Sequence, residues 1–288
     1  MVPGRPRRAE ARGGPELAAR RRLDVELVTR GLASSRSEAG ALVAASRVLV
    51  AGAVAEKTSR QVSSSEPLVV TEPLPRFASR GGEKLDAALW GFGVEVKGKE
   101  ALDAGTSTGG FTDCLLQWGA SRVVAVDVGR GQLLVRLRAD PRVEVMEGRN
   151  IRYLSPEDVG GRRFDIVVAD LSFISLTVVA GVLVGLARPA ADLVVLVKPQ
   201  FEAGKALVSK GRGVVRDAGA WASALRSVAE AFVAAGAGAV GVMASPLRGA
   251  RGNAEFFLHT RPGEGDAAAM GNFEEIVASV LASAGARR

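Results

Sequence analysis

Short apolar runs alternate with amphipathic, helix-like stretches along the chain from about residue 100 to residue 260. The runs are EALDAG, RVVAVDVG, VEVMEG, FDIVVADLS, ADLVVLVKP, GAVGVMASP and AEFFLHT. This alternation is typical of a doubly wound α/β sheet, in which helices connect parallel strands. The last two runs are joined by LRGARGN, which is too short for a crossover helix, so we expect these two strands to pair antiparallel.

The reversed last strand separates this predicted sheet from a typical dinucleotide-binding sheet. A Rossmann-like α/β sheet of seven strands that ends in an antiparallel hairpin resembles the class I methyltransferase fold. The resemblance implies that a cofactor binds at the carboxyl ends of the first strands, where the backbone can come close to a ligand.

A different pattern precedes this sheet. Apolar residues at helical spacing between Leu23 and Gly31 predict one short helix, and Ser35 followed by Glu38 is a capping box that predicts the start of a second. The segment RVLVAGAVAEK then predicts a β-hairpin. Two helices and a hairpin in this order resemble the S4 RNA-binding domain, a small α+β unit.

These patterns divide the chain into four parts. We expect a basic, disordered arm over residues 1–21, the S4-like domain over 22–66, a linker over 67–79 and the methyltransferase-like domain over 80–288. The linker is predicted from SSSEPLVVTEPLP, which contains three prolines and has no helical period.

Positive charge is concentrated at the amino-terminal end. The net charge is +7, and the first 60 residues hold twelve Arg and Lys against six Asp and Glu. This asymmetry favours a polyanionic partner, although a solvated arginine-rich surface is the plain alternative. From the S4 resemblance we expect RNA contacts, mainly to phosphates, from Arg21, Arg22, Arg30, Ser35, Arg36, Ser37 and Arg47.

The first strand of the larger domain runs into a glycine-rich turn, DAGTSTGGFTD. The turn lacks the G-x-G-x-x-G order of dinucleotide sites and carries an acid within the strand. A carboxylate there would repel a pyrophosphate but could accept the ammonium of a methionine moiety. We therefore expect S-adenosylmethionine as the cofactor, with contacts from Asp103, Gly105, Ser107, Gly109 and Gly110. A purely structural turn is the alternative.

Two later strand ends complete the predicted cofactor pocket. Asp127 ends the second strand, where a carboxylate can bind two ribose hydroxyls, a feature that NAD sites share. Asn150 follows the third strand, where this fold usually contacts adenine. Asp170 follows the fourth strand and could serve either the cofactor pocket or catalysis.

Six ordered motifs make a family resemblance explicit: SRGGEKLDAAL, LDAGTSTGGFTD, VVAVDVGRGQL, VVADLSFISL, VLVKPQFEAG and GNAEFFLH. Together they resemble the TlyA family of RNA 2′-O-methyltransferases, which has also been called haemolysin, over nearly the whole chain. The wider FtsJ-like group shares a Lys-Asp-Lys-Glu tetrad, which this sequence matches at Lys84, Asp170, Lys198 and Glu255.

The tetrad suits transfer to a ribose hydroxyl, which is a poor nucleophile and must lose its proton. Lys198 is the candidate base, because desolvation and a neighbouring Lys84 favour a neutral amine that can accept a proton. The family resemblance implies that Asp170 and Glu255 position the lysines. Structural ion pairs are the alternative for each charge taken alone.

The resemblance implies ribosomal RNA, or an assembled ribosomal subunit, as the partner. It implies a cytidine of the large subunit as substrate and leaves the small subunit open as a second one. A non-catalytic ribosome-assembly factor and a membrane-active haemolysin are the alternatives.

Several features limit other functions. The single Cys114 excludes an internal disulfide and a cysteine-based zinc site, and the single His259 leaves almost nothing for histidine metal ligation, so we expect no metal site. The apolar runs are too short to span a membrane, and no secretory signal is expected. We therefore expect a cytoplasmic protein, most simply a monomer.

Overall fold

The computed structural model describes residues 20–71, 76–202, 213–264, 274 and 276–282. The chain divides into two compact units, Met1–Leu74 and Pro75–Arg288. Nearly all of the predicted basic arm, residues 1–19, lies outside the described residues.

The small unit has the predicted order of two helices followed by a hairpin. Its helices are α1 (Leu23–Thr29) and α2 (Arg36–Ala44), and its strands are β1 (Arg21–Arg22), β2 (Val48–Val50), β3 (Ala53–Val54), β4 (Gln61–Val62) and β5 (Leu68–Val70). Ser35 caps α2 by accepting a hydrogen bond from the Glu38 amide at 3.2 Å. Strands β2 and β3 form the predicted hairpin.

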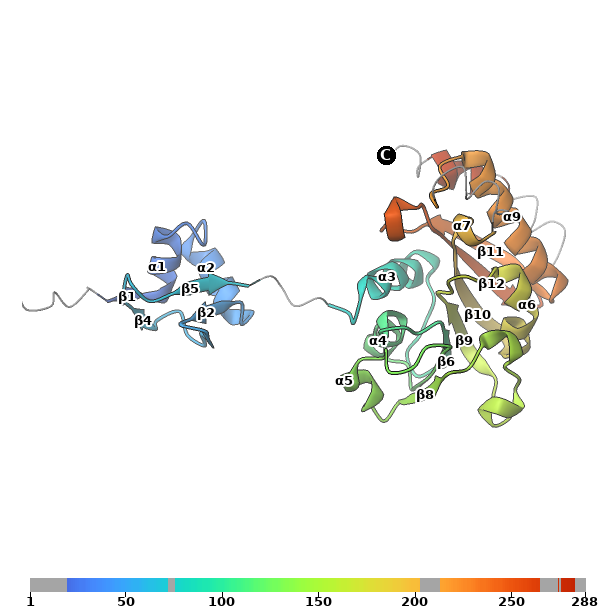
Figure 1. Cartoon of the computed structure of the whole chain (residues 1–288), viewed down its shortest axis with the longest axis horizontal. Coiled ribbons are helices and arrows are strands. Elements are labelled where there is room, and N and C mark those ends of the chain that lie inside the picture. The colour runs from blue at the N-terminus through green and yellow to red at the C-terminus, as the bar shows by residue number, and fades with distance from the viewer. Residues whose placement is uncertain (1–19, 72–75, 203–212, 265–273, 275, 283–288) are drawn as a thin grey trace, which may run out of the picture. The chain divides into compact units, whose positions relative to one another are not determined.

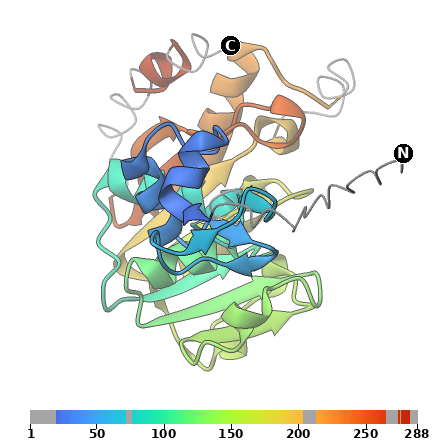
Figure 2. The same cartoon turned by 90° about the vertical axis from the view of Figure 1, so that its left-hand side faces the viewer.

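One apolar core holds the small unit together. The two helices lie together on one side of the strands (Figures 1 and 2). Leu23 and Leu27 of α1 pack with Leu42 of α2 and with the inner face of β2. Strand β5 also pairs with β2, and because β5 lies within the predicted linker of residues 67–79, the unit extends at least to Val70.

The larger unit is built on one sheet of seven strands. These are β6 (Glu100–Ala104), β7 (Arg122–Asp127), β8 (Val143–Glu147), β9 (Phe164–Ala169), β10 (Ala187–Val197), β11 (Ala237–Ala244) and β12 (Phe256–Pro262). All seven predicted strands are confirmed. Their order across the sheet is β11-β12-β10-β9-β6-β7-β8.

The predicted reversal of the last strand is also confirmed. Strand β12 is antiparallel to both of its neighbours, β10 and β11, whereas the pairs from β10 through β8 are parallel. The amino end of β12 therefore lies at the same sheet edge as the carboxyl ends of β6, β7, β9 and β10.

Helices cover both faces of this sheet (Figures 1 and 2). One face packs against α3 (Arg80–Phe92), α4 (Gly110–Gln117) and α5 (Val135–Arg138), and the other against α6 (Leu176–Gly185) and α9 (Ala218–Ala234). A sheet covered on both faces needs apolar side chains on both, which is why its central strands appear as continuous apolar runs. The short elements α7 (Pro199–Glu202), η1 (Ile151–Tyr153), η2 (Glu157–Val159) and η3 (Ala250–Gly252) lie in the connections.

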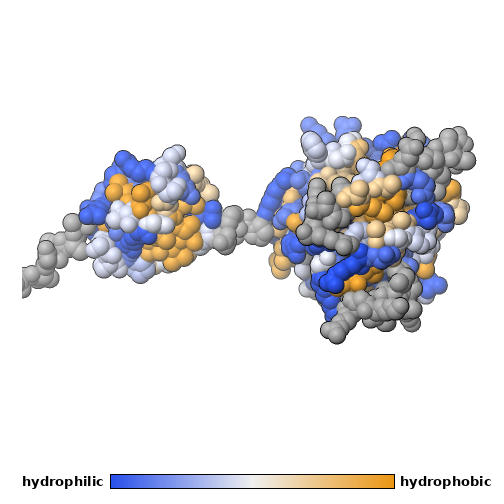
Figure 3. All heavy atoms as spheres, turned by 90° about the horizontal axis from the view of Figure 1, so that it is seen from above, coloured by the Kyte–Doolittle hydropathy of each residue, from blue (hydrophilic) through white to orange (hydrophobic). Residues whose placement is uncertain are grey.

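The surfaces of both units mix hydrophilic and hydrophobic residues in the view of Figure 3. Within the described ranges, no helix combines the length and the apolar character that crossing a bilayer requires.

Candidate active site

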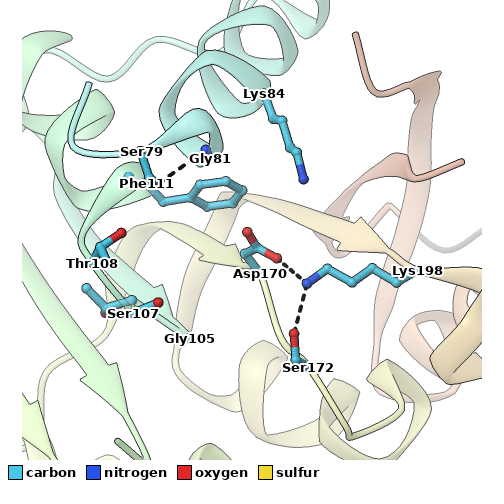
Figure 4. Close-up of a pocket in the computed structure, with 12 residues that line it drawn as sticks. Ser79, Gly81, Lys84, Gly105, Ser107, Thr108, Phe111, Asp170, Ser172 and Lys198 are labelled. Carbon is cyan, nitrogen blue, oxygen red and sulfur yellow. Dashed lines mark hydrogen bonds and ion pairs between the residues drawn. The ribbon is translucent and has the colours of Figure 1, made fainter. Parts of the chain in front are cut away.

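The predicted catalytic residues meet at the carboxyl edge of the sheet. Asp170 directly follows β9 and Lys198 directly follows β10, while Glu255 directly precedes the reversed strand β12. Lys84 reaches the same edge from the second turn of α3. Figure 4 shows Lys84, Asp170 and Lys198 pointing into one space.

The four charges form two short ion pairs. The Nζ of Lys84 lies 2.5 Å from Oε2 of Glu255, and the Nζ of Lys198 lies 2.5 Å from Oδ1 of Asp170. Lys198 also donates to the Oγ of Ser172 at 3.2 Å. Both lysines are buried, and a buried ammonium requires such a partner.

A cavity of about 190 Å³ lies beside these ion pairs, which distinguishes them from ion pairs that only stabilise the fold. Lys84, Asp170, Ser172 and Lys198 line it, whereas Glu255 lies behind Lys84. The cavity therefore exposes two amines and one carboxylate to whatever group enters it.

The position of Glu255 depends on a neighbouring glycine. A β-carbon on Gly249 would lie only 1.8 Å from Oε1 of Glu255, so a side chain at residue 249 would displace the carboxylate. This requirement was not visible in the sequence motif alone.

A second cavity, of about 620 Å³, adjoins the first and shares Gly105, Ser107, Asp170 and Ser172 with it. Asp127 and Asn150, two of the residues expected to contact the cofactor, line this larger cavity. One oxygen of Asp127 accepts a hydrogen bond from the amide of Ser107, and the other accepts one from the amide of Gly129, both at 2.7 Å. These bonds fix the carboxylate while each oxygen keeps a lone pair for a ligand hydroxyl.

The oxygen of the Asn150 side chain has a structural role as well. It accepts a hydrogen bond from the amide of Arg152 at 3.0 Å and so caps η1.

The glycines of the turn are required for different reasons. Gly105 has φ 87°, and a β-carbon there would lie 2.6 Å from the carbonyl oxygen of Asp170. A β-carbon on Gly109 would instead meet Leu137 at 2.3 Å, and Gly109 lines neither cavity. Gly110 lines the smaller cavity. Packing thus accounts for Gly109 without a ligand.

The structure places Asp103 behind the turn. Its side chain is fully buried, lines neither cavity, and accepts a hydrogen bond from the Oγ1 of Thr112 at 2.6 Å. Burial raises the pKa of Asp103 to about 7, and the nearby charge of Asp170 adds to this shift. Direct contact between Asp103 and the cofactor remains a prediction that this position does not favour.

In the small unit, several predicted RNA-binding residues hold the fold. Arg30 donates to Glu26 at 2.8 Å and to two backbone carbonyls, and Arg47 donates to the carbonyl of Thr71 at 2.8 Å. Ser35 is occupied as the cap of α2. For these residues the structural interpretation accounts for the contacts.

The other predicted RNA-binding residues are more exposed. Arg22 and Arg36 both donate to Asp24, and Arg21 lies 3.9 Å from Glu26. The hydrogen bond from Arg22 lowers the pKa of Asp24 to about 2, and the bond from Arg36 acts in the same direction. With the exposed Ser37, these three arginines form a basic surface around α1 and α2.

Sequence reasoning missed two residues beside the tetrad, Ser172 and Phe173. Phe173 is 92% exposed, lines the larger cavity and has φ 65°, which is unusual for a residue other than glycine. The motif DLSF carried both residues, but only the fold shows that they turn toward the cavities.

Among the described residues, no group of three or more His, Cys, Asp or Glu side chains could hold a metal ion.

Comparisons with known proteins agree with this architecture. Residues 77–261 match the model of the FtsJ-like methyltransferase family, and residues 21–68 match the S4 domain. The chain is 52% identical over 246 residues to the 16S/23S rRNA (cytidine-2′-O)-methyltransferase TlyA of Mycobacterium tuberculosis, covering 85% of this chain and 91% of that protein. It is 37% identical to Hemolysin A of Brachyspira hyodysenteriae, covering 83% of this chain and 98% of that protein.

A solved structure gives the same result for the fold. A candidate hemolysin from Streptococcus thermophilus superposes with a TM-score of 0.67 at 35% identity, covering 91% of this chain and 96% of that chain. The two family matches cover the small unit and the larger unit in their order along the chain. The chain belongs to the TlyA family of FtsJ-like methyltransferases that carry an S4 domain.

Proposed function

We propose that this protein is an S-adenosylmethionine-dependent methyltransferase that modifies the ribose 2′-hydroxyl of a cytidine in ribosomal RNA. The observation that carries the proposal is the pairing of two cavities: one lined by the lysines and Asp170, the other by a fixed carboxylate at the end of β7. The TlyA relative, whose name states this reaction, supports the substrate class.

The residues around the larger cavity fit the proposed cofactor. Asp127 is held by two backbone amides and can accept two ribose hydroxyls, and Asn150 and Ser107 lie in the same wall. Gly105 lets the backbone approach a ligand closely. When bound, S-adenosylmethionine supplies an electrophilic methyl group on a sulfonium.

The smaller cavity would receive the acceptor hydroxyl. To act as the base, Lys198 must first lose its own proton to solvent; the neutral amine would then accept the proton of the hydroxyl, and Asp170, 2.5 Å from the amine, would balance the ammonium that forms again. Lys84, held by Glu255, stabilises negative charge on the oxygen from the other side of the cavity. All four residues belong to one chain, so a monomer carries the whole tetrad.

The small unit supplies affinity for RNA. Arg21, Arg22 and Arg36 keep large exposed fractions, so we assign them, with Ser37, to phosphate contacts. Such contacts are sensitive to salt and carry little base preference. Choice of the nucleotide therefore rests with the methyltransferase unit, where the exposed ring of Phe173 offers a surface for a base.

We further propose the large ribosomal subunit as substrate and the small subunit as a second one, because the relative is named for both RNAs. A non-catalytic assembly factor would bind the same RNA without transferring a methyl group.

The test is transfer of tritiated methyl from S-adenosylmethionine to purified large subunits, small subunits and naked rRNA, followed by mapping of the 2′-O-methylated sites. We expect Lys198→Ala to abolish transfer while cofactor binding persists. Lys99→Ala is the matched control, since Lys99 also pairs with an aspartate, Asp192, but at the opposite edge of the sheet. Near-normal transfer by Lys198→Ala would refute the assignment, and no label with any substrate would favour the assembly factor.

A further inference from the structure

Two chain segments form the wall that carries the candidate base. Residues 170–176 follow β9 and include Asp170 and Ser172, and residues 198–202 follow β10 and begin with Lys198. The ion pair between Lys198 and Asp170 joins the two segments at the end nearest the sheet.

A second set of contacts joins the same segments at their far ends. One oxygen of Glu202 accepts a hydrogen bond from the backbone amide of Leu176 at 2.9 Å, and the other accepts one from the hydroxyl of Ser175 at 2.5 Å. Ser175 is itself the cap of α6 and accepts a hydrogen bond from the amide of Thr177 at 3.1 Å. Glu202 therefore ties the end of α7 to the start of a ten-residue helix.

An aromatic contact lies between these two ends. The rings of Phe173 and Phe201 are 5.3 Å apart, and the amine of Lys198 lies 5.8 Å from the centre of the Phe201 ring. The contacts thus follow the same order along both segments: Lys198 with Asp170, Phe201 with Phe173, and Glu202 with Ser175.

The segment after β9 needs such support. Phe173 is held in the left-handed region at φ 65°, a conformation that a bulky side chain adopts only when its surroundings impose it. Most of the Phe173 side chain is exposed, so contacts of that side chain supply little of the restraint. Instead, the hydrogen bonds that Ser175 and Leu176, two and three residues after Phe173, donate to Glu202 hold the backbone of this segment.

Burial of Glu202 is costly and therefore informative. Desolvation raises the pKa of Glu202 even though two hydrogen bonds oppose this shift. A helix cap could be provided by a fully exposed side chain, so a partly buried carboxylate that bonds across to the other segment indicates that the closeness of the two segments matters.

We propose that Glu202 is a positioning residue for methyl transfer: by clasping residues 170–176 to residues 198–202, it holds Lys198, Asp170 and Ser172 in the geometry of proton transfer. The inference rests on the proposed function. Glu202 lines neither cavity and acts only through the residues it holds.

Three variants test this role in the full chain, with the RNA substrate that the wild type labels. Glu202→Ala removes both hydrogen bonds and should lower kcat by roughly 10- to 100-fold, because a displacement on the order of 1 Å can cost that much. Glu202→Gln keeps an oxygen for the Leu176 amide and gains an NH₂ group that can donate to Ser175. It should stay within about threefold of the wild-type kcat.

Asp217→Ala is the matched control, since Asp217 caps α9 by accepting a hydrogen bond from the Ala220 amide at 2.7 Å and lines neither cavity. It should reduce thermal stability by an amount similar to Glu202→Ala but keep kcat within about threefold of wild type.

Three results would overturn the proposal. One is a wild-type kcat in Glu202→Ala. Another is an equal loss of kcat in Asp217→Ala, which would indicate a general stability effect. The third is an equal loss in Glu202→Gln and Glu202→Ala, which would mean that hydrogen bonding is not what matters. A wild-type protein that transfers no methyl group would instead reject the proposed function.

Discussion

Replacing Asp103 with asparagine should change the pH dependence of stability. As the pH rises from acid to above neutral, the free energy of unfolding of the variant should increase relative to that of the wild type. Asp103 is fully buried behind the glycine turn, and its hydrogen bond from Thr112 can be kept by the oxygen of an asparagine amide. The exchange therefore removes one ionisable group with little change in shape.

The magnitude follows from the shift of the Asp103 pKa from 3.8 to about 7, which burial causes. Between these values the folded protein keeps a proton that the unfolded chain has released. The stability associated with that proton is fully present below pH 3.8 and is lost as the pH rises through about 7. At about 1.4 kcal/mol per pH unit, the wild type loses on the order of 3 kcal/mol from this group between about pH 5 and about pH 8.

The assay is urea denaturation of the cofactor-free wild type and Asp103→Asn at about pH 5 and about pH 8, so that all other titrating groups cancel. The unfolding free energy of the variant minus that of the wild type should be larger at about pH 8 than at about pH 5, by on the order of 3 kcal/mol. Asp140→Asn, at a partly exposed carboxylate paired with Arg142, should show no such gain. An Asp103→Asn difference that is equal at both pH values would refute a raised pKa.

Three further predictions concern the cofactor pocket, the tetrad and the small unit. Asp127→Ala should weaken cofactor binding by roughly 10- to 100-fold in calorimetry, because hydrogen bonds to a charged group are lost; unchanged affinity would contradict the ribose role. Glu255→Ala leaves Lys84 buried without its partner and should lower both thermal stability and transfer, whereas a fully active variant would argue against a tetrad. Asp24→Asn removes a carboxylate whose pKa the Arg22 hydrogen bond lowers from 3.8 to about 2. The stability this carboxylate gives the small unit is present above pH 3.8 and lost as the pH falls toward 2, so circular dichroism should show less acid-dependent unfolding in the variant.

Local patterns in the sequence were enough to predict the order of elements. The seven apolar runs predicted seven strands, and the short LRGARGN connection predicted the reversed one, because connection length restricts how two strands can pair. Since strand ends in such a sheet share one edge, the positions of Asp170, Lys198 and Glu255 along the chain also predicted that they would lie at the sheet edge that carries the cofactor.

The tertiary structure decided what each of these residues contacts. Lys84 and Glu255 are 171 positions apart, and only the folded chain brings them to 2.5 Å. Arg30 matched the pattern of an RNA contact but is held by Glu26 and two backbone carbonyls.

Asp103 and Glu202 show why the sequence could not settle these roles. A sequence gives residue types and their spacing, whereas burial and the choice of partner come from packing between segments that are distant along the chain. The depth of Asp103 behind its turn is set by α4 and the neighbouring strands, and the contacts of Glu202 require two loops that follow different strands. The sequence by itself determined the fold and the chemistry available at one sheet edge, and long-range packing decided which of those groups face the cavities and which hold them in place.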